Sequence, residues 1–192
     1  MILSDRELKG IIEKGAVYVK DGVTPINLST QLGPSSIDLR LGDKFIIFQN
    51  TRMSLLDTKN MKLDGLTTDI YADKNEGIVI HPGQFILGTT MEFLKIPNDM
   101  AVRIEGRSSY GRIGIAVHST AGFCDPGWEG QVTLEIQNLG VVPVKLYPGE
   151  RVCQAVFHKM TSEAEVPYYM KKDAKYMNQA QTTLSRLEME KR

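Results

Sequence analysis

The stretch GQVTLEIQN (residues 130–138) alternates apolar and polar residues with the period of a β-strand. Successive side chains of a strand point to opposite faces of a sheet, so Val, Leu and Ile occupy the centre of one face. The opposite face carries Glu135 between two neutral polar residues. The pattern therefore predicts a strand that buries one face in a core and presents Glu135 on the other.

Short runs rich in Val, Ile and Phe continue on both sides of this stretch. They are separated by segments rich in Gly, Pro, Asn, Asp and Ser, such as QLGPSS (31–36), HPGQ (81–84) and LYPGE (146–150). Many short strands separated by turns predict an all-β fold, either a sandwich, a jelly roll or a distorted barrel.

The N-terminal segment has a different pattern. Ser4 and Glu7 have the spacing of a capping box, an apolar stripe follows, and Gly15 supplies a stop signal. These signals predict one short helix over about residues 5–14, ahead of the strands.

Composition limits the kinds of protein that this chain can be. With 192 residues and 42% hydrophobic content, we expect a single domain over residues 1–192. The 23 basic and 23 acidic residues balance, which argues against binding of nucleic acid or an acidic membrane surface. No segment approaches the roughly 20 apolar residues of a membrane span, so we expect a cytoplasmic protein. Cys124 and Cys153 lack a Cys-x-x-Cys partner, which favours two reduced, half-buried thiols.

The segment EGRSSYGRIG (residues 105–114) interrupts the strand pattern with charged and small residues. Gly106 ends a predicted strand, so hydroxyl and backbone N–H donors just after it are free to converge on an anion. A polar loop with solvated arginines is the alternative. The donors in question are Arg107, Ser108, Ser109 and Arg112.

Two further polar segments are marked by glycine and separated from the first by apolar strands. PSSIDLRLG (34–42) contains Asp38 and Arg40, and STAGFCDPGWEG (119–130) contains Asp125 at a predicted turn. The three segments are interpreted as parts of one site, although their sequence alone does not bring them together.

The series PSSIDLRLG, EGRSSYGRIGIAVHSTAGFCDPGWEGQVTLEIQN, PGERVCQ and DAKYMNQ resembles the dCTP deaminases, which share a fold with the trimeric dUTP diphosphatases. The resemblance runs in order from about residue 30 to residue 186. It implies a distorted β-barrel of jelly-roll type and a homotrimer with active sites between neighbouring subunits. It also implies hydrolysis of dCTP to dUTP and ammonia, with about residues 170–192 forming a C-terminal lid or tail.

The resemblance also implies roles for individual residues. Glu135 would move protons between the attacking water and the cytosine ring, a task that suits a carboxylate. Ser108 and the Ala121 carbonyl would hold that water, and Arg112 would orient Glu135. Asp125 would accept the sugar 3′-hydroxyl. The implied substrate-binding residues are Arg107, Ser108, Ser109, Arg112, Asp125, Gln154, Tyr168, Lys175 and Gln179.

The cysteines and histidines of the sequence indicate whether the enzyme needs zinc. Another class of nucleobase deaminases holds zinc in an H-x-E…P-C-x-x-C pattern. The two cysteines and three histidines of this chain do not form that pattern. We therefore expect a zinc-independent enzyme and Mg²⁺ that arrives on the substrate triphosphate. The resemblance further suggests dTTP as an inhibitor.

Four functions stay open: a plain deaminase, a bifunctional enzyme, a dUTP diphosphatase alone and a non-enzymatic module. The Lys-Tyr-x-Asn-Gln tail favours a deaminase over a diphosphatase, which would usually end in a glycine-rich arm. HSTAGFCDPG (118–127) is similar to bifunctional enzymes that continue to dUMP and diphosphate, with Asp125 directing a second water. Plain deamination ranks first and the bifunctional enzyme second. A non-enzymatic nucleotide-binding jelly-roll module ranks behind both.

Overall fold

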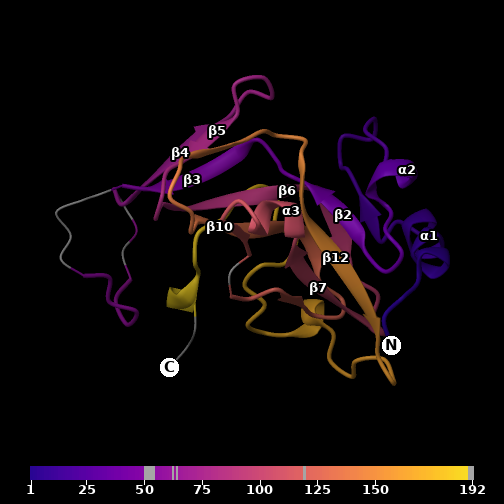
Figure 1. The fold of residues 1–192 in the computed structure, drawn as a ribbon. Coiled ribbons are helices and arrows are strands. Elements are labelled where there is room, and N and C mark those ends of the chain that lie inside the picture. Colours follow the sequence, from indigo (N-terminus) through magenta and orange to yellow (C-terminus); the bar gives the residue numbers. More distant parts are fainter. Residues whose placement is uncertain (50–54, 62, 64, 119, 190–192) are drawn as a thin grey trace.

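The computed structural model describes residues 1–49, 55–61, 63, 65–118 and 120–189, and these form a β-rich molecule (Figure 1). The helices are α1 Asp5–Glu13, α2 Leu28–Gln31, α3 Ser108–Gly111 and the 3-10 turns η1 Tyr168–Met170 and η2 Leu187–Met189. The strands are β1 Val17–Tyr18, β2 Ile37–Arg40, β3 Lys44–Phe48, β4 Thr67–Tyr71, β5 Ile78–Ile80, β6 Phe85–Lys95, β7 Met100–Gly106, β8 Ile115–Val117, β9 Phe123–Cys124, β10 Glu129–Asn138, β11 Val144–Leu146 and β12 Arg151–Lys159. The predicted all-β class is confirmed.

The strands of the described residues belong to three antiparallel sheets. The largest has the order β4-β3-β6-β10-β8, with β1 also paired to β6. A second has the order β2-β12-β7-β9, and β11 pairs with β5 in the third. These ladders do not join into one closed barrel, so the predicted barrel is realised as packed open sheets that share one hydrophobic core.

Helix α1 begins and ends close to the predicted residues. The Ser4 N–H donates to the Glu7 carboxylate at 3.0 Å, as a capping box requires, and Leu8 and Ile11 are buried. Gly15 has φ +81°, a left-handed value that glycine adopts without steric cost and that ends the helix. In Figure 1, α1 lies beside β2 and β12.

Strand β10 confirms the alternation expected for residues 130–138. Val132, Leu134 and Ile136 are buried in the core, and Glu135 lies on the half-exposed face. β10 pairs with β6 on one side and with β8 on the other, so hydrogen bonds hold it along both edges. The strand is therefore a rigid support for Glu135.

The segment after β12 packs against the rest of the fold. The Gln131 N–H donates to the Gln179 carbonyl at 2.8 Å, and the Asn178 N–H donates to the Glu129 carbonyl at 2.8 Å. The Thr182 hydroxyl donates to the Lys44 carbonyl at 2.7 Å. The tail thus runs along β10 and reaches β3.

The two cysteines are free thiols, as expected. Cys124 is partly buried, and burial raises the pKa of its thiol to about 12. Cys153 is completely buried, not half-buried, because β12 lies between β2 and β7. No helix in the described part of the chain is long and apolar enough to cross a membrane.

Candidate active site

A pocket of about 480 Å³ opens beside the half-exposed face of β10. Five predicted site residues line it: Glu135, Ala121, Asp125, Tyr168 and Gln179. Its remaining wall is largely apolar and includes Phe48, Phe85, Leu87, Phe123, Trp128 and Leu184. A carboxylate in a largely apolar pocket is partly desolvated, which suits a group that exchanges protons with a bound ligand.

The Glu135 carboxylate is held by the segment that follows β8. Oε2 accepts the Thr120 backbone N–H at 3.2 Å and the Thr120 hydroxyl at 2.9 Å. Two donors from one residue restrict how the carboxylate can rotate on its strand. Sequence reasoning missed Thr120, because no local pattern shows that this segment folds back over β10.

His118 connects two of the predicted groups. Its backbone N–H donates to the Glu135 carbonyl at 2.9 Å, and its ring Nε2 lies 2.9 Å from the Ala121 carbonyl oxygen. A carbonyl only accepts hydrogen bonds, so Nε2 carries a proton in this contact. Nδ1 is buried and has no partner in the described part of the chain. The residue has φ 63°, which is rare outside glycine.

Gly122 allows this segment to lie close to β7. The Ile104 N–H donates to the Gly122 carbonyl at 2.7 Å. A Cβ at Gly122 would lie only 2.6 Å from the Ile104 carbonyl oxygen. A larger residue would push the segment away from β7 and disturb the Ala121 carbonyl next to it.

A second group of predicted residues lies outside this pocket, around α3 and the start of β12. Ser108, Ser109 and Arg112 are exposed on or next to α3. Arg107 precedes α3, and Gln154 on β12 pairs with Asp38 of β2 and Glu105 of β7. Within the described residues, none of these predicted side chains lines the Glu135 pocket.

Arg107 is held in this second group by an ion pair and a hydrogen bond. Its Nε lies 3.1 Å from the Asp38 carboxylate, and its Nη1 donates to the Arg151 carbonyl at 2.8 Å. Burial raises the pKa of Asp38, while Arg107 and Arg151 lower it by a smaller amount. Nearby, the Tyr110 hydroxyl donates to Glu150 at 3.1 Å, and burial together with Glu150 raises the pKa of Tyr110 to about 12.

Two predicted site residues, Lys175 and Gln179, belong to the C-terminal tail. Gln179 is almost fully buried, and its amide donates to the Gln131 carbonyl at 3.0 Å and to the Thr133 hydroxyl at 2.5 Å. The Lys175 carbonyl accepts a hydrogen bond from Arg186. Gln179 therefore ties the tail to β10 at the edge of the pocket, and its contact with a triphosphate stays a prediction.

The predicted site is thus divided into two groups in a single chain. Arg112 is not among the described residues that line the Glu135 pocket, so the expected orienting contact stays a prediction. The described residues also contain no group of three or more His, Cys, Asp or Glu side chains that could hold a metal ion.

The all-β fold of this chain is similar to that of a solved nucleotide-deaminase structure. The solved structure of 2′-deoxycytidine 5′-triphosphate deaminase from Agrobacterium tumefaciens matches with a TM-score of 0.64 and 24% sequence identity. The match covers 82% of this chain and 47% of that chain, so this chain spans about half of that structure's length.

The chain belongs to the dCTP deaminase-like family, whose model matches residues 2–160. It is 44% identical over 191 residues to a protein of Methanobrevibacter smithii named "dCTP deaminase, dUMP-forming", with 98% of this chain and 96% of that protein covered. It is 42% identical over 189 residues to a dCTP deaminase of Natronomonas pharaonis, with 98% and 95% covered. The resemblance stated from the motifs is confirmed.

Proposed function

We propose that the protein deaminates dCTP and continues to dUMP. One observation carries the proposal. The Glu135 carboxylate, held by Thr120, shares a pocket with the Ala121 carbonyl and Asp125. These are a proton-transfer group, an acceptor for water and an acceptor for a sugar hydroxyl, which together match what hydrolysis of a nucleoside amine requires.

The first reaction is dCTP plus water to dUTP plus ammonia. Glu135 takes a proton from a water held by the Ala121 carbonyl and Ser108, and the resulting hydroxide adds to C4 of the cytosine. Glu135 passes that proton to N3 and then moves the proton of the new C4 hydroxyl to the exocyclic amine, so that ammonia leaves as C4=O forms. Arg112 stabilises the carboxylate and the charge that develops on the ring.

The site is completed by a second copy of the chain. Ser108 and Arg112 lie outside the Glu135 pocket of their own chain, and Ser108, Ser109 and Arg112 are exposed. We propose a homotrimer in which the α3 region of one chain reaches the β10 pocket of its neighbour. A cyclic arrangement supplies every pocket with one such partner.

Asp125 and the relatives favour the second reaction, dUTP plus water to dUMP plus diphosphate. Asp125 lines the same pocket as Glu135, where it can direct a second water towards the α-phosphate. The relative from Methanobrevibacter smithii is named as dUMP-forming. We therefore prefer the bifunctional enzyme, which the motifs ranked second, over release of dUTP.

Metal use, inhibition and location complete the proposal. Mg²⁺ arrives on the triphosphate and needs no protein cage, and deamination proceeds without zinc. Inhibition by dTTP and a cytoplasmic location are proposed with it. Zinc analysis of the purified protein, dTTP titration and cell fractionation test these points.

Product analysis tests the proposed function. The protein is incubated with dCTP and Mg²⁺, ammonia is measured, and nucleotides are separated by chromatography. Ammonia with dUMP and diphosphate is the expected result. Ammonia with dUTP alone would limit the function to deamination. Absence of ammonia would exclude both deaminase functions, and a second incubation with dUTP would then separate a diphosphatase, which forms dUMP, from a nucleotide-binding module, which forms nothing.

A further inference from the structure

Asp38 holds two arginines at the predicted phosphate side of the site. Its Oδ2 lies 3.1 Å from Arg107 Nε and 3.2 Å from Arg151 Nη1. The Arg107 Nη1 also donates to the Arg151 carbonyl at 2.8 Å. Two guanidinium groups therefore share one carboxylate, which leaves a net charge of about +1 on the three side chains.

Both arginines keep donors that the fold does not use. Their side chains are 27% and 36% exposed. In the described part of the chain, Nη2 of Arg107 and Nη2 of Arg151 donate to no protein acceptor. Paired guanidinium groups with free Nη2 donors can bind several oxygens of a phosphate chain.

A β-bulge explains why Arg151 reaches this position. The pairing of β12 with β2 shifts register between Arg151 and Cys153, and Val152 and Cys153 are both buried. Without the bulge, Arg151 would share the buried face of Cys153. The extra residue instead puts Arg151 on the half-exposed face that carries Gln154. Bulges occur often beside binding sites, where they redirect a side chain.

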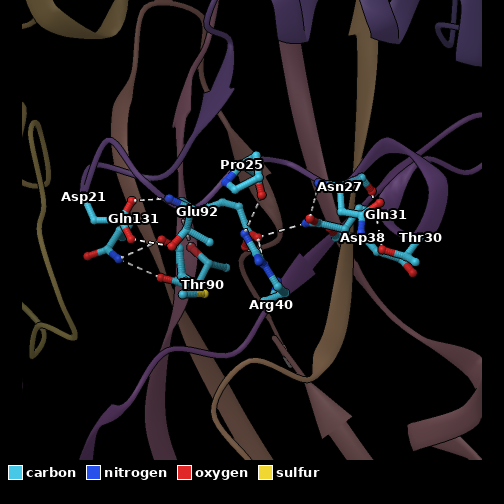
Figure 2. Close-up of polar contacts among 12 residues, drawn as sticks. Asp21, Pro25, Asn27, Thr30, Gln31, Asp38, Arg40, Thr90, Glu92 and Gln131 are labelled. Carbon is cyan, nitrogen blue, oxygen red and sulfur yellow. Dashed lines mark hydrogen bonds and ion pairs between the residues drawn. The ribbon is translucent and has the colours of Figure 1, made fainter.

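A network of hydrogen bonds fixes the backbone of Asp38. Figure 2 shows this network, which contains Gln31, Arg40 and Glu92. The Gln31 amide donates to the Asp38 carbonyl at 2.9 Å and to the Glu92 carboxylate at 2.9 Å. Glu92 is fully buried and also accepts from Arg40, through Nε at 2.6 Å and the backbone N–H at 2.7 Å. The end of α2 also holds Arg151, which donates a hydrogen bond to the Thr30 carbonyl.

We propose that Arg151 is a further phosphate-binding residue and that Asp38 is the positioning residue that holds Arg107 and Arg151 side by side for the substrate triphosphate. The inference rests on the proposed function, in which a triphosphate binds beside α3. Arg151, three positions before Gln154, is not among the substrate-binding residues that the motifs implied. Two unscreened guanidinium groups would repel each other, and the carboxylate between them removes that repulsion.

Binding of inorganic tripolyphosphate, measured by calorimetry, tests the proposal without any turnover. We expect Arg151→Gln to weaken binding by about 10- to 100-fold, the loss typical of a hydrogen bond to a charged group. Arg103→Gln is the matched control, because Arg103 is an exposed arginine on β7 paired with Glu105 and outside the cluster. This control should bind like the wild type, which separates a specific contact from a general loss of charge.

Asp38→Asn distinguishes positioning from simple charge. Removal of a negative charge would by itself strengthen binding of an anion, whereas loss of positioning should weaken it several-fold. Asp38→Glu should restore part of the affinity. In steady-state kinetics with dCTP, all effects should appear mainly in KM, and inhibition by deoxycytidine, which has no phosphate, should not change.

The outcomes separate this inference from the proposed function. If the wild type binds tripolyphosphate but releases no ammonia from dCTP, the proposed function fails and the anion site stands. If Arg151→Gln keeps wild-type affinity with unchanged oligomer mass and thermal midpoint, Arg151 contacts no phosphate. Tighter binding by Asp38→Asn would overturn the positioning role, and should that variant fail to fold, Asp38→Glu and Arg151→Lys carry the same comparison. A wild type that binds no tripolyphosphate would overturn the whole inference.

Discussion

Glu135 depends on a residue that lies 15 positions away in the sequence. Its strand determines which face it occupies, but Thr120 determines how its carboxylate is turned, through two hydrogen bonds to Oε2. His118 connects the same strand to the Ala121 carbonyl by bonds at its backbone and its ring. At the scale of single residues, the segment after β8 therefore positions the proton-transfer group and the water acceptor together.

Glu135→Gln should abolish ammonia release and leave nucleotide binding largely intact, because the amide keeps the shape and cannot accept a proton. Loss of a general base costs about 10² to 10⁴ in rate. Ammonia release and binding of dCTP by calorimetry are the measurements.

Glu129→Gln is the matched control for that variant. Glu129 lies on the same face of β10 but does not line the Glu135 pocket; it accepts the Tyr18 hydroxyl at 2.7 Å. It should keep near-normal turnover. Deamination by Glu135→Gln within a few-fold of the wild type would show that another group moves the proton.

At the scale of elements, β10 connects the core to the site. Its buried face packs in the core, its edges pair with β6 and β8, and its half-exposed face carries Glu135 and docks the tail through Gln131 and Thr133. A change in its packing should therefore affect stability and, through the position of Glu135, catalysis.

Leu134→Ala should lower the free energy of unfolding by about 2–5 kcal/mol, because it leaves a cavity beneath the centre of β10. Leu134 is completely buried. Urea denaturation measures the loss. Val142→Ala is a useful comparison, since Val142 is 60% exposed after β10 and should change stability by less than about 0.5 kcal/mol. Equal losses in both variants would contradict this account of the core.

At the scale of the whole molecule, the separation of the α3 group from the β10 pocket predicts complementation between two inactive chains. In a mixture of Glu135→Gln and Arg112→Ala chains, some interfaces combine an intact β10 pocket with an intact α3 region. Every cyclic trimer that contains both variants has one such interface among its three, so protein freed of single-variant trimers should recover about one third of the sites. Co-expression with two affinity tags, followed by assay of the doubly purified protein, measures this recovery.

Each variant assembled alone should remain inactive in that experiment. Mixtures that stay inactive, although mass measurement shows mixed trimers, would place both residues in sites formed within one chain.

Alkaline pH should destabilise the folded protein. Burial raises the pKa of Cys124 to about 12 and, with help from Glu129 and Glu150, the pKa values of Tyr18 and Tyr110 to about 12 as well. The unfolded chain ionises first, near pH 8.5 for cysteine and pH 10 for tyrosine. The stabilisation by these groups is therefore complete below about pH 8.5 and is lost as pH rises towards 12.

Urea midpoints at pH 8 and pH 10.5 measure this effect, and a clear fall is expected. Cys124→Ala should reduce the fall in the urea midpoint, because it removes a thiol whose pKa is raised in the folded protein. Equal midpoints at the two pH values would show that these groups ionise alike in the folded and unfolded chain.

The sequence by itself determined the features that depend on neighbouring residues. The capping box at Ser4 and Glu7 gave α1, and the alternation of residues 130–138 gave β10, its buried face and the side of Glu135. Such patterns are readable because the periods of helices and strands are fixed by local backbone geometry. The motifs also indicated the family that the comparisons then established.

Only the tertiary structure decided which distant residues meet. Thr120 lies on Glu135, and Asp38 lies between Arg107 and Arg151, with Asp38 and Arg151 separated by 113 positions. The bulge before Cys153 reverses the side on which Arg151 lies, and no local period predicts it. These contacts follow from strand pairing across the chain, where the free energy of burying a common core selects among many registers that the sequence allows locally.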